Sequence, residues 1–470
     1  LKTLLVCIAI TALSFFSFQS PVLNAASFIF IIIAVAALAS HSLLYGVMAL
    51  FGELLISSQG HLFDLYLGNF RFSLRMGLFA VLIIVWGLPR LKQFLHKPRE
   101  FIFSLKKNEL INDYSMYAVF GIIIIFSIVN GILNHNSPSY IFQDANGYFF
   151  FALLPIFISA ILEYKKPAHT IILTIWAAGI VFQAIEQGVL LFLYGHLDVF
   201  WRMMVSLYEW FRDQRIVEVG LYKYNFYRVF LQSNLFAVMG LITFSSIWLF
   251  QKTKKVVRPY SLILVSAFFA LIVSLSRSFW IATVVGVVFI VVMYIIFARP
   301  RFSIICARLA QSFIIAGASI FIIAFLILVP IGQFIGFDAL ASLSDRATET
   351  DEAAISSRWS LLPALLYAAQ KQPILGSGFG ATVTYKTEDP RYLAAHPDNP
   401  YYTTFAFEWG WLDVWYKLGA IGLFAYLALI GSIMMRGVKH INGLSLKGGN
   451  NQQSNLPDSL AITKNTPSPK

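Results

Sequence analysis

Long apolar stretches alternate with short polar segments along nearly the whole chain. A helix that crosses a bilayer needs about 20 apolar residues, and in lipid every backbone polar group must be satisfied within the protein. The pattern therefore predicts an all-α fold, a polytopic membrane protein with about 12 transmembrane helices. The second and third stretches are short enough to form one re-entrant hairpin instead. The apolar stretches fall at residues 3–19, 27–40, 42–58, 73–94, 115–133, 148–164, 168–194, 229–250, 260–275, 278–298, 311–332 and 412–435.

The composition agrees with this membrane interpretation. Hydrophobic residues make up 58% of the 470 residues and charged residues 12%, whereas a soluble domain carries about 25% charged residues. The net charge of +12 clusters in short loops between apolar stretches, where it orients helices in a bilayer, so no nucleic-acid partner is expected. With only Cys7 and Cys306, and no tight cluster of Asp, Glu or His, the sequence predicts no disulfide framework, no metal site and no cofactor.

Basic residues mark every second loop, and the basic loops of membrane proteins tend to stay in the cytoplasm. The loops between them are then predicted to face outward. The basic loops are Arg90 to Lys107, Lys165-Lys166, Lys252 to Arg258, Arg299 to Arg308 and Arg436 to Lys447. The predicted outer loops are those near 59–72, 134–147, 195–228, 276–277 and 333–411.

This topology divides the chain into four predicted parts. Residues 1–332 form a transmembrane bundle, and residues 333–411 form a large outer-face (periplasmic) segment with amphipathic helices. Residues 412–447 form the last transmembrane helix and the cytoplasmic end of the chain. Residues 448–470 are rich in Asn, Ser, Pro and Lys, which is typical of a disordered tail.

Arginines are unexpectedly frequent on the predicted outer side, where positive charge is usually depleted. Those within residues 197–217 lie on a segment patterned like an amphipathic surface helix, and we expect them to reach lipid headgroups. Arg228 and Arg277 each lie at the end of a predicted helix, without loop enough to reach away from the bundle. Arginine's planar fork suits bidentate phosphate recognition, so these two indicate a pyrophosphate ligand. The alternative is that they too bind lipid headgroups.

Several local patterns in the C-terminal half of the chain match one family of membrane enzymes. Two of them open predicted helices, Arg228 with Asn234 and then Ser276-Arg277-Ser278. The others are Ser357-Arg358-Trp359, the turn Pro373 to Gly380, and Leu412 followed by Leu418-Gly419-Ala420-Ile421-Gly422-Leu423. In their order and spacing, over about residues 225–435, they resemble the O-antigen ligase and polymerase superfamily.

The resemblance implies an enzyme that moves lipid-linked glycans. Its donor would be a polyprenyl-diphosphate-linked glycan, and its acceptor a hydroxyl-bearing glycan or glycolipid. The site would lie on the outer (periplasmic) face of the bacterial cytoplasmic (inner) membrane, with membrane lipids around it. The resemblance also implies a metal-independent reaction, in which Arg228, Arg277 and Arg358 bind the diphosphate. Arginines against a leaving diphosphate stabilise the charge that grows in the transition state.

The catalytic base is where the sequence departs from the superfamily pattern. Ligases of the superfamily carry a histidine shortly before the helix that follows the large outer segment. Here the nearest titratable side chain is Glu408, and the nearest histidine is His396. Either Glu408, shielded by Trp409 and Trp411, removes the acceptor's proton, or His396 does so along a different loop path. Glu408 has the alternative role of a helix N-terminal carboxylate, and His396 that of a solvated loop residue.

Two local structures are predicted within the large outer segment. Residues 357–371 place four apolar side chains at helical spacing and so predict a non-spanning helix, provided that Pro363 falls in its first turns. The glycines of the run Gly376–Gly380 are also common in phosphate-binding loops, but no strand precedes them and no Lys-Ser/Thr follows. The run therefore predicts a tight turn that lets the backbone approach another element.

The leading functional hypothesis is a membrane glycosyltransferase of the O-antigen ligase type. Within enzymes the alternative is a repeat-unit polysaccharide polymerase, because nothing in the sequence names the acceptor. Outside enzymes the alternative is a transporter or flippase of lipid-linked sugars, for which charged groups along the spans or an internal repeat are expected. No clear repeat is visible and the titratable groups concentrate on one face, so the enzyme is favoured.

Overall fold

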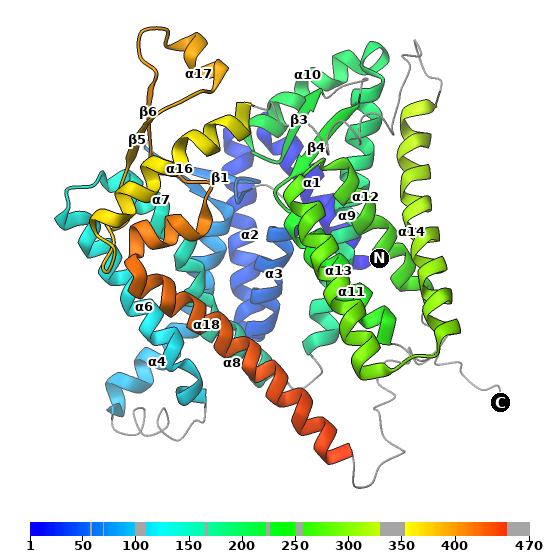
Figure 1. The fold of residues 1–470 in the computed structure, drawn as a ribbon, viewed down its shortest axis with the longest axis horizontal. Helices are drawn as coiled ribbons and strands as arrows, with labels where there is room; N and C mark the ends of the chain where they lie inside the picture. Colours follow the sequence, from blue (N-terminus) through cyan, green and yellow to red (C-terminus); the bar gives the residue numbers. More distant parts are fainter. Residues whose placement is uncertain are drawn as a thin grey trace. The chain divides into compact units, whose positions relative to one another are not determined.

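Helices occupy each of the predicted apolar stretches, and the chain is mainly helical (Figure 1). The computed structural model describes residues 1–56, 59–68, 70–98, 110–164, 168–221, 226–250, 257–329 and 353–448. The predicted disordered tail lies outside the described residues from residue 449 onward.

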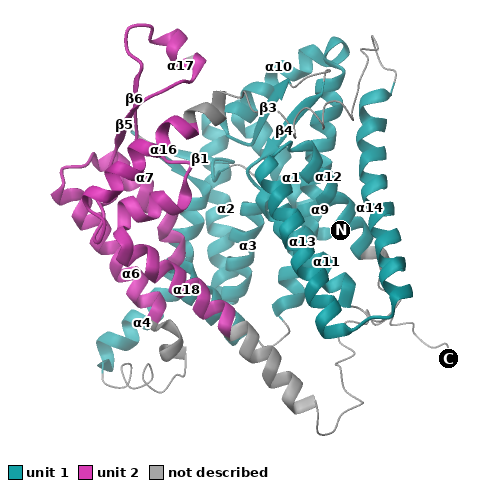
Figure 2. Cartoon of the chain, viewed as in Figure 1, with its two compact units in different colours: residues 1–98, 152–350 teal, residues 99–151, 351–470 magenta. Residues whose placement is uncertain are grey.

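The chain divides by its internal contacts into two units, each built from two separate stretches of sequence (Figure 2). Unit 1 consists of Leu1–Pro98 and Ala152–Thr350, and unit 2 consists of Arg99–Phe151 and Asp351–Lys470. This grouping differs from the predicted division at residue 332, because helices from the 99–151 stretch pack with the C-terminal helices.

Unit 1 contains most of the helices and two of the β-hairpins. Its elements are α1 (Lys2–Phe18), α2 (Pro21–His41), α3 (Leu43–Ile56), β1 (Asp64–Leu67), β2 (Phe70–Ser73), α4 (Leu74–His96), α8 (Leu153–Glu163), α9 (Ala168–Gly195), α10 (Leu197–Asp213), β3 (Val217–Leu221), β4 (Tyr227–Leu231), α11 (Asn234–Phe250), α12 (Val257–Val273), α13 (Arg277–Ala298) and α14 (Phe302–Leu328).

Unit 2 combines two helices from the middle of the chain with the predicted outer segment and the last helix. Its elements are α6 (Leu110–Leu133), α7 (Pro138–Phe149), α16 (Ala353–Lys371), β5 (Val383–Lys386), α17 (Pro390–Ala395), β6 (Tyr401–Thr404) and α18 (Gly410–Gly448). The short 3-10 helix η1 (Phe150–Ala152) ends its first stretch and leads into α8.

The described residues include eight candidate membrane spans, fewer than the predicted number of about 12. Four further apolar helices are shorter, and α11 is one of them because the apolar residues just before it belong to β4. The shorter helices are Lys2–Phe18, Leu43–Ile56, Asn234–Phe250 and Tyr260–Val273. The eight spans are Pro21–His41, Leu74–His96, Met116–Leu133, Pro138–Glu163, Ala168–Gly195, Arg277–Ala298, Phe302–Leu328 and Gly410–Met435.

Three two-stranded antiparallel hairpins correct the all-α prediction to a mainly helical fold. β1 pairs with β2, β3 with β4, and β5 with β6. In β5 buried Val383 and Tyr385 alternate with exposed Thr384 and Lys386, the period of two that a strand imposes. Strands of four or five residues are too short for this alternation to stand out in an apolar sequence.

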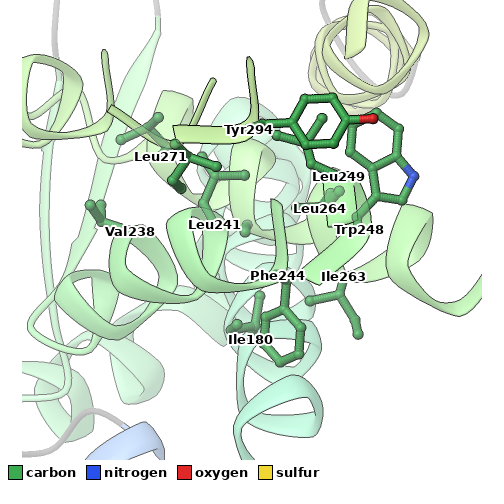
Figure 3. Close-up of a cluster of buried hydrophobic side chains, with 12 residues drawn as sticks. Ile180, Val238, Leu241, Phe244, Trp248, Leu249, Ile263, Leu264, Leu271 and Tyr294 are labelled. Atoms are coloured by element: carbon green, nitrogen blue, oxygen red, sulfur yellow. The ribbon is translucent and has the colours of Figure 1, made fainter. Parts of the chain in front are cut away.

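The core of unit 1 lies where α9, α11, α12 and α13 meet (Figure 3). Ile180 of α9 packs with Phe244 of α11 and Ile263 of α12, and Tyr294 of α13 closes the cluster beside Trp248. These side chains come from segments up to 114 residues apart in sequence, so the packing fixes α11, which follows the strand of Arg228, and α13, which begins at Arg277.

Two predicted non-spanning helices are present. The amphipathic segment near 197–217 forms α10, which ends at Asp213, where β3 soon begins. The predicted helix of the large segment forms α16, but it begins at Ala353, so Pro363 lies in its middle rather than in its first turns. Leu361, Leu365 and Ala369 of α16 are buried together in the core of unit 2.

Candidate functional site

The predicted outer loops of unit 1 are bonded to one another at one end of that unit. Arg71 of β2 bonds Asp64 at 2.6 Å and also the backbone oxygen of Asp213 at 3.0 Å. Arg228 joins the β3–β4 hairpin to the turn between α12 and α13, through the backbone oxygen of Ser274. Loops 59–72, 195–228 and 276–277 therefore lie at one end of unit 1. Such an arrangement is required if all three face the same side of the membrane, as predicted.

Arg228 lies within a strand of this end, and its guanidinium is half-buried. It sits on β4 opposite Gly220 of β3, its Nε donates to the Ser274 oxygen at 3.0 Å, and its guanidinium lies 4.9 Å from the ring centre of Phe230. Burial lowers the pKa of the Arg228 guanidinium, and nearby Glu218 opposes that lowering. Among the described residues no carboxylate lies within ion-pair distance of Arg228. A half-buried cation of this kind favours an anionic ligand.

The turn from α12 to α13 carries the second arginine. Leu275 is fully buried there with a φ of 47°, a left-handed conformation that is strained for leucine. Arg277 follows as the first residue of α13, at a helix end whose dipole favours anions rather than cations. Because Arg228 bonds the Ser274 carbonyl, the two arginines flank the same short turn. Asn234 and Arg277 begin α11 and α13 as predicted.

The glycine-rich turn of unit 2 uses all its amides within the protein. The five backbone N–H groups from Gly376 to Gly380 each donate to a protein oxygen, at distances of 2.7 to 3.1 Å. No amide of this turn remains for a phosphate, so the predicted tight turn is confirmed. The acceptors are, in order, the backbone oxygens of Gln372, Tyr416, Lys417 and Ser127 and the Oδ2 atom of Asp144.

Close approach to two helices explains why this turn needs glycine. Its three glycines have φ of 73° or 77°, in the left-handed region. A Cβ on Gly378 would lie 2.2 Å from the backbone nitrogen of Gly131 on α6, and one on Gly376 would lie 2.5 Å from that of Gly419 on α18. Gly419 itself interrupts the α18 helix with a φ of 73°, so the turn is wedged between α6 and a kink in α18.

A buried cation holds the turn and the next segment together. Lys417 is 3% exposed, and its Nζ lies 2.7 Å from Asp144 Oδ1 and 2.8 Å from Asp413 Oδ1. The same Nζ donates to the backbone oxygen of Phe405 at 2.7 Å. Asp144 therefore accepts both Lys417 and the Gly380 amide. Since Phe405 lies three residues before Glu408, this ion cluster anchors the segment that carries the predicted base.

Arg358 and Glu408, predicted separately as a diphosphate ligand and as the base, form an ion pair in unit 2 through Nε and Oε2. Trp409 supports the pair, because its Nε1 donates to the Arg358 backbone oxygen at 2.9 Å and its ring packs edge-on against Trp359. The Glu408 side chain is nevertheless 55% exposed, so the neighbouring tryptophans do not shield it from water as expected.

His396 lies at the opposite end of the β5–β6 hairpin from Glu408. The strands pair from Val383 with Thr404 to Lys386 with Tyr401, and α17 lies beyond the second pair (Figure 1). A four-residue strand spans about 10 Å between these ends. His396 is exposed, and its ring stacks on Tyr392 with centroids 4.4 Å apart. The structure thus brings Arg358 to Glu408 and leaves His396 apart from both.

One comparison with known proteins identifies part of the chain. Residues 261–427 match the model of the O-antigen ligase family. The chain carries an O-antigen ligase domain. No curated protein and no solved structure matches the chain. With its apolar helices, this domain indicates an integral membrane protein of polysaccharide biosynthesis that acts on a lipid-linked glycan and an acceptor, as a ligase or a polymerase.

The O-antigen ligase domain contains most of the predicted site residues. Arg277, Arg358, His396 and Glu408 lie inside residues 261–427, whereas Arg228 lies before them. The domain includes residues of both units: Arg277 falls in unit 1, whereas Arg358, His396 and Glu408 fall in unit 2. Among the described residues no group of three or more His, Cys, Asp and Glu side chains is arranged to hold a metal ion.

Sequence analysis missed the ion cluster around Lys417 in the O-antigen ligase domain. Its signal was present, because Lys417 and Asp413 interrupt the apolar stretch 412–435, and a charge inside a membrane span commonly marks a site. Asp144 is 273 residues away from Lys417, and no local pattern connects the two. Only the folded unit shows that they form one pair.

Proposed function

We propose that the protein transfers or polymerises a polyprenyl-diphosphate-linked glycan on the outer face of the cytoplasmic membrane. One observation carries the proposal: Arg228 is a half-buried cation with no carboxylate partner among the described residues, and it flanks the turn that leads to Arg277 at the start of α13. Two arginines around a helix N-terminus suit a diphosphate, because the guanidinium forks and the helix dipole both favour anions.

An apolar cavity in unit 1 supports a lipid-linked donor. It measures about 630 Å³ and is lined by α9, α12 and α14, including Gly188, Phe269 and Leu326. Of these helices, α12 leads directly into Ser274, whose carbonyl accepts the hydrogen bond of Arg228. A prenyl chain in this cavity would gain the free energy of apolar burial while its diphosphate meets the arginines. The O-antigen ligase domain covers the α12 and α14 walls.

The proposed reaction is a displacement at the anomeric carbon of the donor. The acceptor hydroxyl oxygen forms the new glycosidic bond, and the bond from that carbon to the diphosphate oxygen breaks. The polyprenyl diphosphate leaves with the electron pair, and Arg228 and Arg277 stabilise its growing charge. The hydroxyl proton passes to a base, for which Glu408 is favoured over His396 because it is anchored through Phe405 and Lys417. No step requires a metal ion.

Arg358 is also proposed to bind the diphosphate. Because Arg358 forms an ion pair with Glu408, binding of a diphosphate there would affect the proposed base. A carboxylate held by a guanidinium is a weaker base than a free one. When a diphosphate competes for Arg358, the Glu408 carboxylate is released. Donor binding would therefore precede proton removal, and the exposed position of both side chains allows this exchange without disturbing the core.

A ligase and a polymerase differ in the acceptor that they use. Analysis of the glycans of a deletion strain distinguishes the two. Loss of a ligase leaves lipid-linked chains of normal length that are not attached, whereas loss of a polymerase leaves single repeat units. A flippase is the alternative outside enzymes. It is tested with purified protein in nanodiscs, which have no closed compartment and therefore support no transport.

In this test the lipid-linked glycan and an acceptor are incubated with the nanodiscs, without nucleotide or gradient, and the products are resolved by mass spectrometry. The proposal predicts a glycosylated acceptor and free polyprenyl diphosphate. Unchanged donor in nanodiscs, together with transbilayer movement of the donor in closed vesicles, would contradict the proposal and support the flippase. Arg202→Ala serves as the matched control, because Arg202 is exposed on α10 and lies outside the proposed site.

A further inference from the structure

A second cavity of unit 1 lies beside Arg228 and has mixed polar and aromatic walls. It measures about 490 Å³, within the range of about 300–1,000 Å³ that small-molecule sites occupy. The walls come from the end of α9, from α10 and from the β3–β4 hairpin. The wall residues used below are Tyr194, Tyr208, Arg212, Arg215, Glu218 and Phe230.

One wall residue presents an unused polar group. The Tyr194 side chain is 9% exposed, and its hydroxyl is buried without a hydrogen-bond partner among the described residues. A buried phenol usually finds a partner, and leaving one unpaired costs free energy. Tyr194 lines the cavity, so a ligand hydroxyl there could supply the missing hydrogen bond.

The cavity shares a wall with the proposed diphosphate site. Phe230 lines the cavity and also lies 4.9 Å from the Arg228 guanidinium, as ring centre to guanidinium carbon. Glu218 lines the cavity too, pairs with Phe230 across the hairpin, and acts electrostatically on Arg228. A ligand that holds its diphosphate at Arg228 would therefore extend its next groups directly into this cavity.

The wall chemistry favours a sugar over a second anion. Tyr208 and Phe230 offer aromatic faces, on which the apolar face of a sugar ring can stack. Arg212 is compensated by Asp213, whose Oδ1 lies 2.8 Å from its Nε. The remaining arginine of the wall, Arg215, is accompanied by Glu218, so the walls carry little net charge. A phosphate or a lipid headgroup would require a clear excess of positive charge.

We propose that this cavity binds the sugar residues that follow the diphosphate of the donor, with stacking on Tyr208 and Phe230 and a hydrogen bond to the Tyr194 hydroxyl. The inference rests on the proposed function, because it takes the diphosphate to lie at Arg228. It adds that the protein distinguishes its glycan through the α10–β3–β4 region, which lies before the matched O-antigen ligase domain.

The test measures binding rather than turnover. Two probes are used with the full-length protein in nanodiscs: sugar-free polyprenyl diphosphate, and the same lipid carrying the glycan repeat unit extracted from the host. Tyr208→Ala removes a wall, and Tyr194→Phe removes only one oxygen. The matched controls are Trp201→Ala, on the exposed part of α10, and Tyr66→Phe, on exposed β1.

The expected result is a selective loss of affinity for the glycan-linked lipid. Its Kd should rise about tenfold with Tyr208→Ala and about threefold with Tyr194→Phe, while the Kd of the sugar-free lipid stays constant. Neither control should change either Kd. Tyr194→Phe is nearly isosteric, so it keeps the test valid if Tyr208→Ala disturbs α10.

Three results would overturn the inference, and each has a distinct meaning. If the wild type binds the two lipids equally, or if the cavity variants weaken both equally, the cavity is not a sugar site although the proposed function stands. If the cavity variants change the Kd of neither lipid, the donor's sugars lie elsewhere, although the proposed function stands. If the wild type binds neither lipid, the proposed function itself fails.

Discussion

The Gly376–Gly380 turn of unit 2 and the Ser274–Arg277 turn of unit 1 are both short, and both contact apolar helices. In the glycine turn every backbone amide donates to the protein, and its three glycines closely approach the backbones of α18, α6 and α7 in turn. In the arginine turn a strained, buried Leu275 sets two cations around a helix N-terminus. The amides of the first turn all donate within the protein, whereas Arg228 beside the second turn has no carboxylate partner among the described residues.

The difference shows that a glycine-rich run does not by itself indicate a phosphate-binding loop. Glycines in a loop indicate close backbone approach, and the partner in that approach can be another helix as easily as a ligand. Anion binding requires donors that remain available. The glycine turn, with every amide bonded, is therefore part of the frame of unit 2, and the arginine turn is the element that we propose to bind the ligand.

The largest effect on stability is expected from a substitution at Gly378, where the glycine turn approaches α6. Gly378→Ala places a Cβ 2.2 Å from the Gly131 nitrogen in a left-handed conformation, so we expect a loss of about 5 kcal/mol of stability. Folded protein in detergent, measured by fluorescence-detected gel filtration, should fall to near zero. A well-folded Gly378→Ala variant that has lost transfer alone would instead make this turn part of the site.

Loss of Lys417, the buried cation beside the glycine turn, should destabilise the protein nearly as much. Lys417→Met keeps the volume but leaves the partly buried carboxylates of Asp144 and Asp413 without their cation, and we expect a loss of about 3 kcal/mol. A thermal melt in detergent measures it, and exposed Lys371→Met is the control. An unchanged melting temperature would show that the cluster does not hold unit 2 together.

The base is expected to affect rate rather than stability. Glu408→Gln should lower the transfer rate about a hundredfold while donor binding is retained, because only proton removal is lost. His396→Ala should change the rate by less than about twofold, since His396 lies at the opposite end of the hairpin. Single-turnover kinetics at saturating donor measures both. The reverse pattern would move the base to His396 and leave the diphosphate proposal intact.

The smallest effect is expected within the glycine turn itself. Ser377→Ala leaves the backbone contacts of the turn in place and removes one side-chain hydrogen bond to Tyr416, so stability should change by about 1 kcal/mol or less. Transfer should also be unchanged, because the account gives the Ser377 hydroxyl no ligand. A loss of transfer above about tenfold, with a normal thermal melt, would contradict the contrast between the two turns.

The sequence predicted those features of the fold that depend on long local patterns. The spacing of apolar residues located the helices, and amphipathic periodicity located α10 and α16. It placed Val229 to Leu231 in a span, because three apolar residues of β4 cannot be separated from the helix that follows. Pro363 was expected near a helix start but lies mid-helix, where tertiary packing of Leu361 and Leu365 outweighs its local cost.

The part of the candidate site that depends on local patterns was also predicted from the sequence. Arg228 and Arg277 stood out because charges at helix ends are visible in a single sequence. The Arg358–Glu408 pair and the Lys417–Asp144 pair join residues 50 and 273 positions apart, so only the fold reveals them. The two proposed roles of Arg358 and Glu408 are thereby coupled in a way that neither residue suggested alone.

The most direct measurement of the central claim is the single-turnover rate of glycan transfer in nanodiscs for Arg228→Ala and Arg277→Ala, each with its melting temperature. The account predicts a loss of about a hundredfold for each at an unchanged melting temperature, equivalent to about 3 kcal/mol of lost leaving-group stabilisation. Lysine at either position should restore little of the rate, because a point charge lacks the bidentate fork. Arg202→Ala should retain the full rate. If Arg228→Ala and Arg277→Ala both transfer glycan at the wild-type rate, the arginine turn does not bind the diphosphate and the account is wrong.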